Sequence, residues 1–221
     1  MKAMILAAGR GKRMAHLTNE LPKPLLEVEG KSLIEHQVER LVQAGFKEIV
    51  INASYMADKI VRAVGFGERW GIKICYSHEI PGGLETGGGV RQALPLLSDL
   101  FLVVNADVWT NYDISNFFQL DMSNKLAHLI LVDNPEHNLK GDYSIDKEAL
   151  VLPEKNGEHY TFAGISCFQK SLFEPYAVGD YFSIPRAMEK PILKRQVTAE
   201  LHHCEWQDIG TPSRLARVCN R

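Results

Sequence analysis

The chain has 221 residues, of which 45% are hydrophobic and 24% are charged, and its formal net charge at pH 7 is −2. This length and composition allow a substantial buried core and exclude a disordered or fibrous chain. The near balance of 25 basic and 27 acidic residues excludes the broad cationic surface that binds nucleic acid or anionic membrane, so a small-molecule ligand is expected.

Strand and helix signals alternate over the first hundred residues. An apolar run at residues 3–7 predicts a strand that enters a glycine-rich turn. Ser32 and Glu35 have capping-box spacing, and apolar residues recur at helical spacing until Gly45, which predicts a helix over 32–44. The next elements are expected in the order strand 48–52, helix 57–64, strand 72–77, helix 88–97 and strand 101–105. This alternation predicts a parallel sheet covered on both faces.

The second half of the chain is less regular. Strands are predicted at 127–133, 161–168 and 200–206, with a weak β segment around 142–152 and a terminal helix from about Pro212. We expect this half to supply the pocket of a second ligand. No linker, repeat or low-complexity tract interrupts the sequence, which predicts one domain over 1–221.

A glycine-rich turn follows the first predicted strand, in the sequence LAAGRGKRM at residues 6–14. Small residues let backbone N–H groups approach a phosphate. A Walker loop would need Ser or Thr after Gly11-Lys12, and a dinucleotide fingerprint would need Gly or Ala where Met14 stands. Taken alone, the turn is as consistent with an ordinary βα connection as with a phosphate-binding site. With Lys12, Arg13 and Lys23 nearby, it indicates a site for a triphosphate and a pyrophosphate leaving group.

Three further residues are candidates because of their position. Lys23 lies between two prolines in LPKPLL, which restrict the backbone to an extended form and fix the direction of the side chain, although a solvated lysine is an alternative. Asp107 follows the strand 101–105, at the sheet edge where ligands of α/β folds bind, and Asp208 follows a late strand. Each aspartate alone is equally consistent with a turn residue.

Cysteines and apolar runs indicate the compartment. Cys75, Cys167, Cys204 and Cys219 lie far apart and form no CxxC pair, so we expect neither a disulfide framework nor a zinc site. The N-terminal apolar run is too short for a signal peptide, and no run approaches the roughly 20 residues that span a bilayer. We therefore expect a cytoplasmic protein with no membrane partner.

The motifs LAAGRGKRM and LPKPLL together resemble the signature of the sugar-1-phosphate nucleotidyltransferase family. The resemblance continues through ETGGG at 85–89, NADVWT at 105–110, Glu154-Lys155 before 162–164, and WQDIGT at 206–211. It implies a Rossmann-like three-layer α/β fold with a mixed, mainly parallel central sheet. It also implies nucleotide binding by a part at about 1–110 and sugar binding by a part at about 111–221.

The resemblance also implies roles for individual residues. Asp107 and Asp208 match the family's magnesium ligands, and Arg13 and Lys23 match its catalytic cations. The nucleotide-binding positions are Ala8, Gly9, Gly11, Lys12, Arg13, Lys23, Glu85, Thr86, Gly87 and Asn105. The sugar-binding positions are Asn105, Gly141, Asp142 and Glu154. Asn156 stands where the family often has a proline, so the alignment of this loop departs from the pattern.

The implied activity is Mg²⁺-dependent transfer of a nucleotidyl group from an NTP to a sugar 1-phosphate. The ETGGG and NADVWT forms are most similar to members that use UTP and N-acetylmuramic acid α-1-phosphate in cell-wall sugar recycling. A mannose- or glucose-1-phosphate nucleotidyltransferase is the alternative within the family. A non-catalytic regulator that binds a nucleotide sugar is the alternative from another class, since fold does not fix function. Because the chain has no β-helix extension after Asp208, we expect a monomer.

Overall fold

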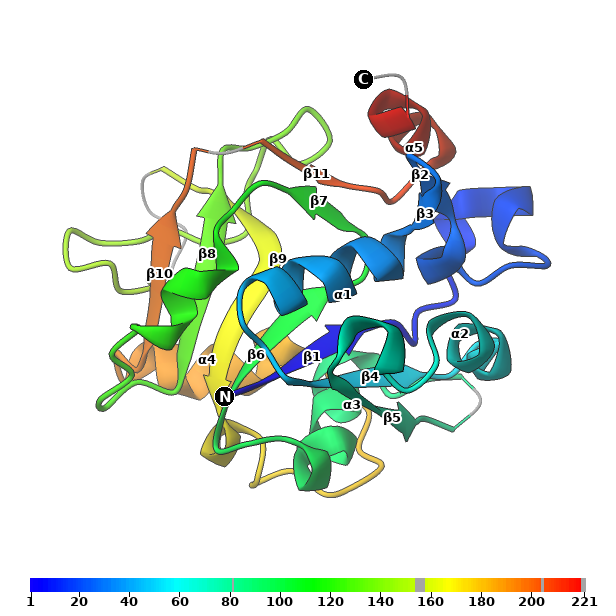
Figure 1. The fold of residues 1–221 in the computed structure, drawn as a ribbon. Coiled ribbons are helices and arrows are strands. Elements are labelled where there is room, and N and C mark those ends of the chain that lie inside the picture. The colour runs from blue at the N-terminus through cyan, green and yellow to red at the C-terminus, as the bar shows by residue number, and fades with distance from the viewer. Residues whose placement is uncertain (81, 154–157, 204, 220–221) are drawn as a thin grey trace.

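A seven-stranded sheet forms the centre of the computed structural model, which describes residues 1–80, 82–153, 158–203 and 205–219 (Figure 1). The strand order is β10-β8-β9-β6-β1-β4-β5. The strands are β1 (Lys2–Leu6), β4 (Glu48–Ala53), β5 (Lys73–His78), β6 (Leu100–Asn105), β8 (Ala127–Val132), β9 (Thr161–Gln169) and β10 (Val197–Leu201). Only β9 in this sheet is antiparallel to its neighbours, so the predicted mixed, mainly parallel sheet is confirmed.

Helices cover both faces of the sheet, which gives the three-layer arrangement that was predicted (Figure 1). The helices are α1 (Leu33–Gln43), α2 (Ala57–Val64), α3 (Glu85–Ala93), α4 (Ile184–Leu193) and α5 (Pro212–Cys219). On one face, α1 and α2 bury apolar residues against alternate positions of β1 and β4, such as Ile5 and Ile51. On the other face, α3 and α4 contribute apolar residues to the cluster that contains Met4 and Val50.

Local signals account for most of the element boundaries. In α1 the hydroxyl of Ser32 accepts from the Glu35 N–H, and the Glu35 carboxylate accepts from the Ser32 N–H, which confirms the capping box. The predicted helix over 88–97 instead begins at Glu85 and gives way to a 3-10 turn at Leu94–Leu96. Pro95 lies in that turn, and its ring does not fit a continuing α-helix.

Two parts of the second half differ from the prediction. No element was assigned over 170–199, yet α4 and most of β10 lie there, and α4 carries Pro191 in its last turn. Interior prolines are helix-breaking signals, which hid this helix. The single strand predicted over 200–206 is wrong, because β10 ends at Leu201 and a separate strand β11 begins at Trp206. The weak segment at 142–152 contains isolated bridges such as Tyr143 with Tyr160.

Two short antiparallel strand pairs lie outside the central sheet. Strands β2 (Glu27–Val28) and β3 (Lys31–Ser32) form one of them. Strands β7 (Val108–Thr110) and β11 (Trp206–Asp208) form the other, in which Asp208 pairs with Val108. The Ile209 N–H also donates to the Asp107 carbonyl at 2.8 Å. This antiparallel pair therefore brings Asp208, about 100 residues later in the sequence, to the end of β6.

Among the described residues, no helix combines the length and the apolar character that crossing a bilayer would require.

Candidate nucleotide-binding site

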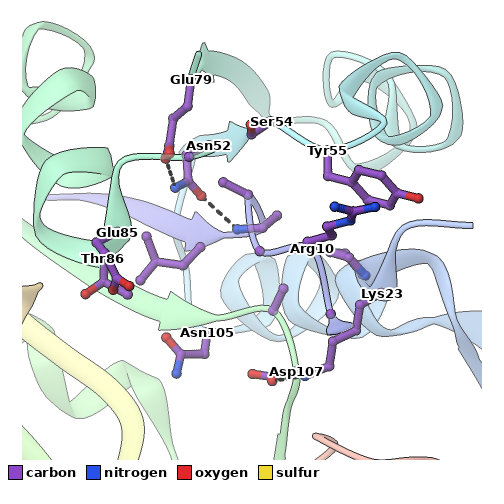
Figure 2. Close-up of a pocket in the computed structure, with 18 of the residues that line it drawn as sticks. Arg10, Lys23, Asn52, Ser54, Tyr55, Glu79, Glu85, Thr86, Asn105 and Asp107 are labelled. Carbon is purple, nitrogen blue, oxygen red and sulfur yellow. Dashed lines mark hydrogen bonds and ion pairs between the residues drawn. The ribbon is translucent and has the colours of Figure 1, made fainter. Parts of the chain in front are cut away.

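A cavity of about 930 Å³ lies at the carboxyl ends of β1, β4 and β6 (Figure 2). In the sheet register, Leu6 at the end of β1 is flanked by Asn52 of β4 and Asn105 of β6. Parallel strands end at the same edge, so their last side chains meet there. The described residues that line the cavity are Leu6–Arg13, Lys23, Pro24, Asn52, Ser54–Met56, Glu79, Gly82, Gly83, Glu85, Thr86, Asn105–Asp107, Tyr181 and Gly210.

The glycine-rich turn forms one wall of the cavity. Gly11 has φ +64°, and a Cβ there would lie 2.9 Å from the Cβ of Lys23, so the turn needs glycine both for its conformation and for close packing. Gly9 has open space around it. Lys12 and Arg13 begin a 3-10 segment and are exposed, and the Arg10 guanidinium lies 5.4 Å from the centre of the Tyr55 ring. The wall therefore offers small residues and cations to a ligand.

Lys23 and Asp107 form an ion pair across the cavity floor, although 84 residues separate them. The extended backbone predicted from the flanking prolines is found at Pro22, but Lys23 and Pro24 lie in a 3-10 turn instead. The Lys23 ammonium donates to Oδ2 of Asp107, and the two side chains are 12% and 26% exposed. The sequence predicts that Lys23 binds phosphate and that Asp107 binds a metal ion, and the structure brings these two side chains into contact.

A buried network joins the turn to the opposite wall, and sequence reasoning did not find it. The Asn52 side-chain carbonyl accepts from the Ala7 N–H at 2.7 Å, and its amide donates to Oε1 of Glu79 at 2.6 Å. Oε2 of Glu79 accepts from the Leu84 N–H at 2.8 Å. Burial raises the pKa of Glu79 above its usual range, although both hydrogen bonds act in the opposite direction.

The wall at the start of α3 contains Glu85 and Thr86, and the glycines after them pack closely on the segment before α4. The N–H groups of Gly87 and Gly88 both donate to the Phe182 carbonyl, at 2.9 and 3.0 Å. A Cβ on Gly87 would lie 2.5 Å from the Phe182 ring. These two glycines therefore let the segment before α4 pack closely on α3.

The same segment holds the polar side chains of this wall. The Thr86 hydroxyl accepts from the Ile184 N–H at 2.9 Å. Glu85 has φ +63°, which is uncommon for a residue other than glycine, and its carboxylate accepts from the Tyr181 hydroxyl at 3.0 Å. Tyr181 is 65% exposed and lines the cavity. No signal in the sequence linked Tyr181 to this site, because it lies 96 residues from Glu85.

The predicted sugar-binding residues fall into three groups. Asn105 lines the cavity and lies against β9, where a Cβ on Gly164 would be 2.8 Å from its amide nitrogen. Gly141 and Asp142 lie in the loop after β8, outside the described cavity wall, and Oδ2 of Asp142 accepts from the Phe162 N–H at 2.8 Å. Glu154 lies outside the described residues.

Asp208 is held by residues that sequence reasoning did not single out. The Arg214 guanidinium of α5 donates to Oδ1, and Nε2 of His137 lies 2.8 Å from the same oxygen. The Asp208 side chain is 23% exposed and that of Arg214 is 9% exposed. Asp107 lies in the turn between β6 and β7 and lines the cavity, whereas Asp208 ends β11 and is not among the described residues of the wall. Carboxylate oxygens are suitable ligands for a hard divalent cation.

Comparison with known proteins shows the family of this chain. Residues 2–221 match the model of the nucleotidyl transferase family. The chain belongs to this family. It is 46% identical over 220 residues to N-acetylmuramate alpha-1-phosphate uridylyltransferase of Neisseria meningitidis serogroup B. The aligned region covers 97% of this chain and 95% of that protein.

Two solved structures share the fold. The structure of HddC from Yersinia pseudotuberculosis complexed with GMP-PN has a TM-score of 0.77 and 25% identity, over 99% of this chain and 98% of that one. A Bacillus anthracis protein assigned as a glucose-1-phosphate thymidylyltransferase has a TM-score of 0.84 at 22% identity, over 100% of this chain and 94% of that one. The second likeness bears on the fold alone, and it agrees with the three-layer architecture described above.

Proposed function

We propose that this chain transfers UMP from UTP to N-acetylmuramic acid α-1-phosphate, giving the UDP-sugar and pyrophosphate. The observation that carries the proposal is the 46% identity, over nearly the whole of both chains, to the Neisseria uridylyltransferase of that substrate. The cavity supports it, since its wall combines the glycine-rich turn with Lys23 and Asp107.

The nucleotide is assigned to residues 1–110 and the sugar to residues 111–221. Almost all of the described cavity wall comes from the first part, and Tyr181 and Gly210 come from the second. In this assignment the backbone of Ala8, Gly9 and Gly11 approaches the phosphates, as free space at Gly9 allows. Lys12 and Arg13 then neutralise the triphosphate.

The base and ribose are assigned to the walls beyond the turn. Glu85 and Thr86 line the cavity there, and Gly87 is placed by its hydrogen bond to the segment before α4. Asn105 lies at the end of β6, between the nucleotide part and β9, which suits a contact with both substrates. Gly141, Asp142 and Glu154 remain our proposed contacts to the sugar.

The reaction is assigned to an in-line displacement at the α-phosphorus of UTP. An oxygen of the sugar phosphate forms the new P–O bond, and the bond to the β-phosphate oxygen breaks, so that pyrophosphate leaves with the electron pair. The second pKa of a phosphate monoester is about 6, so the oxygens of the sugar phosphate are already anionic at neutral pH. The attacking oxygen therefore needs no general base. Arg13 and Lys23 stabilise the charge that develops on the phosphates.

Asp107 and Asp208 are the residues that would hold Mg²⁺. Their carboxylates are the oxygen donors that Mg²⁺ prefers, and it commonly completes its octahedron with phosphate oxygens and water. The described residues contain no group of three or more His, Cys, Asp or Glu side chains that could hold a metal alone, which fits a site completed by substrate. When bound, Mg²⁺ supplies charge neutralisation at the reacting phosphates.

The test is release of pyrophosphate from UTP with Mg²⁺, with N-acetylmuramic acid α-1-phosphate compared with glucose 1-phosphate, mannose 1-phosphate and N-acetylglucosamine 1-phosphate. Asp107→Asn should abolish release, and Asp58→Asn, which changes an exposed carboxylate in α2, should not. Release only with another sugar would keep nucleotidyl transfer and overturn the substrate. Absence of release with every sugar and NTP would overturn the enzyme assignment.

A further inference from the structure

Arg214 is a buried arginine whose side chain points back from α5 to the end of β11. It is 8% exposed, and Nη1 donates to Oδ1 of Asp208 and lies 2.7 Å from Nε2 of His137. Burying a guanidinium removes it from water, which is unfavourable unless charged or polar partners compensate. Nε also donates to the Thr211 hydroxyl at 3.4 Å, so Asp208 is the carboxylate among three described partners that hold the guanidinium in place.

The position of Gly210 shows how closely the guanidinium fits. A Cβ on Gly210 would collide with Nη2 of Arg214 and would lie 3.1 Å from Oδ2 of Asp208. Gly210 itself lines the cavity, together with Asp107. Oδ1 of Asp208 therefore faces Arg214, and Oδ2 lies beside the residue that forms the cavity wall.

We propose that Arg214 is a positioning residue for Asp208: it binds Oδ1, fixes the rotation of the carboxylate, and thereby presents Oδ2 to the divalent cation. The proposal rests on the proposed function, in which Asp208 is a metal ligand. A carboxylate that is already oriented loses less conformational freedom on binding a cation, and partners behind metal ligands commonly change metal affinity by about 10- to 100-fold.

The alternative for Arg214 is competition with the cation for Asp208. A guanidinium beside a metal site repels the metal, so removing it would strengthen binding if repulsion outweighed positioning. A merely structural role, anchoring α5, is a third reading. This reading can be tested separately, because α5 is also held by a hydrogen bond that does not involve the Arg214 side chain. In that bond the side-chain amide of Gln207 donates to the backbone carbonyl of Arg214 at 3.2 Å. Removal of the Arg214 side chain should weaken metal binding if the side chain positions Asp208 and strengthen it if the side chain competes with the cation. Metal affinity should stay unchanged if the side chain only anchors α5.

The experiment measures binding of Mn²⁺, a probe for Mg²⁺, to the full chain in the presence of a non-hydrolysable UTP analogue, from the decrease in the EPR signal of free Mn²⁺. Arg214→Met removes every donor while keeping an unbranched side chain, and we expect a loss of Mn²⁺ affinity of about 10-fold or more. Arg214→Lys keeps one cationic donor and should recover part of this loss. Arg217→Gln, on the same helix with a side chain 67% exposed, is the matched control and should bind as the wild type does.

Gly210→Ala is a second variant, because its methyl group crowds both the guanidinium and Oδ2 of Asp208 without removing either, and it should also weaken Mn²⁺ binding. Thermal unfolding of each variant verifies that the fold is intact. Unchanged or tighter Mn²⁺ binding by folded Arg214→Met would overturn the proposal while leaving the proposed function intact. Failure of the wild type to bind Mn²⁺ would also overturn the proposal, and pyrophosphate release by the wild type then decides separately whether the proposed function fails with it.

Discussion

The network between Asn52 and Glu79 allows a stability test in which two groups are exchanged. Asn52 is 3% exposed, and its amide and the Glu79 carboxylate each have defined partners at both ends. Asn and Asp, like Glu and Gln, have nearly the same shape, so Asn52→Asp with Glu79→Gln changes hydrogen bonding without changing volume. In the double variant every donor again meets an acceptor, and one buried carboxylate remains.

Each single substitution should be destabilising. Asn52→Asp places a carboxylate oxygen against Oε1 of Glu79, where the present distance is 2.6 Å, so two buried carboxylates must share a proton or repel each other. Glu79→Gln must turn its amide toward either the Asn52 amide or the Leu84 N–H, which are both donors. An unmet or repulsive buried polar group costs about 1–3 kcal/mol, so we expect a loss of about 2 kcal/mol in each case.

The double variant should lie within about 1 kcal/mol of the wild type, which gives a favourable coupling of about 3 kcal/mol between the two sites. Urea unfolding followed by tryptophan fluorescence measures the free energies. The loss of unfolding free energy in Asn52→Asp should also become smaller at acidic pH. The two neighbouring carboxylates raise the pKa of the pair in the folded state, so the folded state is favoured below that pKa and loses this stabilisation as the pH rises through it. If the double variant is as unstable as the two single losses together, the hydrogen-bond directions described for this network are wrong.

Three further predictions concern activity, packing and pH. Asp107→Asn should lower kcat/KM for pyrophosphate release by about 100-fold or more, measured with saturating Mg²⁺, because electrostatic contacts to reacting phosphates contribute on this scale. Gly88→Ala should lower the free energy of unfolding by about 1–3 kcal/mol, since its Cβ would collide with the Asp180 carbonyl, whereas Gly9→Ala, in open space, should change stability much less. Burial lowers the pKa of His128 below its ordinary 6.5, so the free energy of unfolding should fall as the pH drops from 6.5 toward that lowered value. Unfolding measured at pH 7.5 and 5.5 should show this fall in the wild type, and the part due to His128 should be absent in His128→Gln.

The first half of the fold could be predicted because its strands are buried on both faces and its helices have clear ends. The strand at 48–52 and the helix at 57–64 were recognised from short continuous apolar runs and amphipathic spacing. The helix α4 was missed because Pro185 and Pro191 at its two ends are tolerated only in its particular context. The division of the late strand into β10 and β11 depends on pairing with two different partners, β8 and β7, which local sequence does not encode.

Sequence and structure agree on where the candidate site lies, and they differ in which contacts build it. The glycine-rich turn, Lys23, Asn105 and Asp107 were selected as ends of strands or turns, and they all line one cavity. Their chemical roles remain predictions. The Asn52–Glu79 network could not be found in this way, because an asparagine and a glutamate 27 residues apart carry no motif until the sheet aligns them.

The two cation–carboxylate pairs of the site differ in their relation to the cavity, and this assigns them different roles. Lys23 lines the cavity, and its ammonium has three N–H donors, so it can keep Asp107 and also donate to a phosphate oxygen. Arg214 is not among the described residues of the wall, whereas Gly210, on which a Cβ would collide with the guanidinium, does line the cavity. Lys23→Gln should therefore weaken binding of a UTP analogue even without a divalent cation, measured by calorimetry in EDTA. Arg214→Met should leave that metal-free affinity unchanged, and a loss equal to that of Lys23→Gln would show that Arg214 contacts the nucleotide directly.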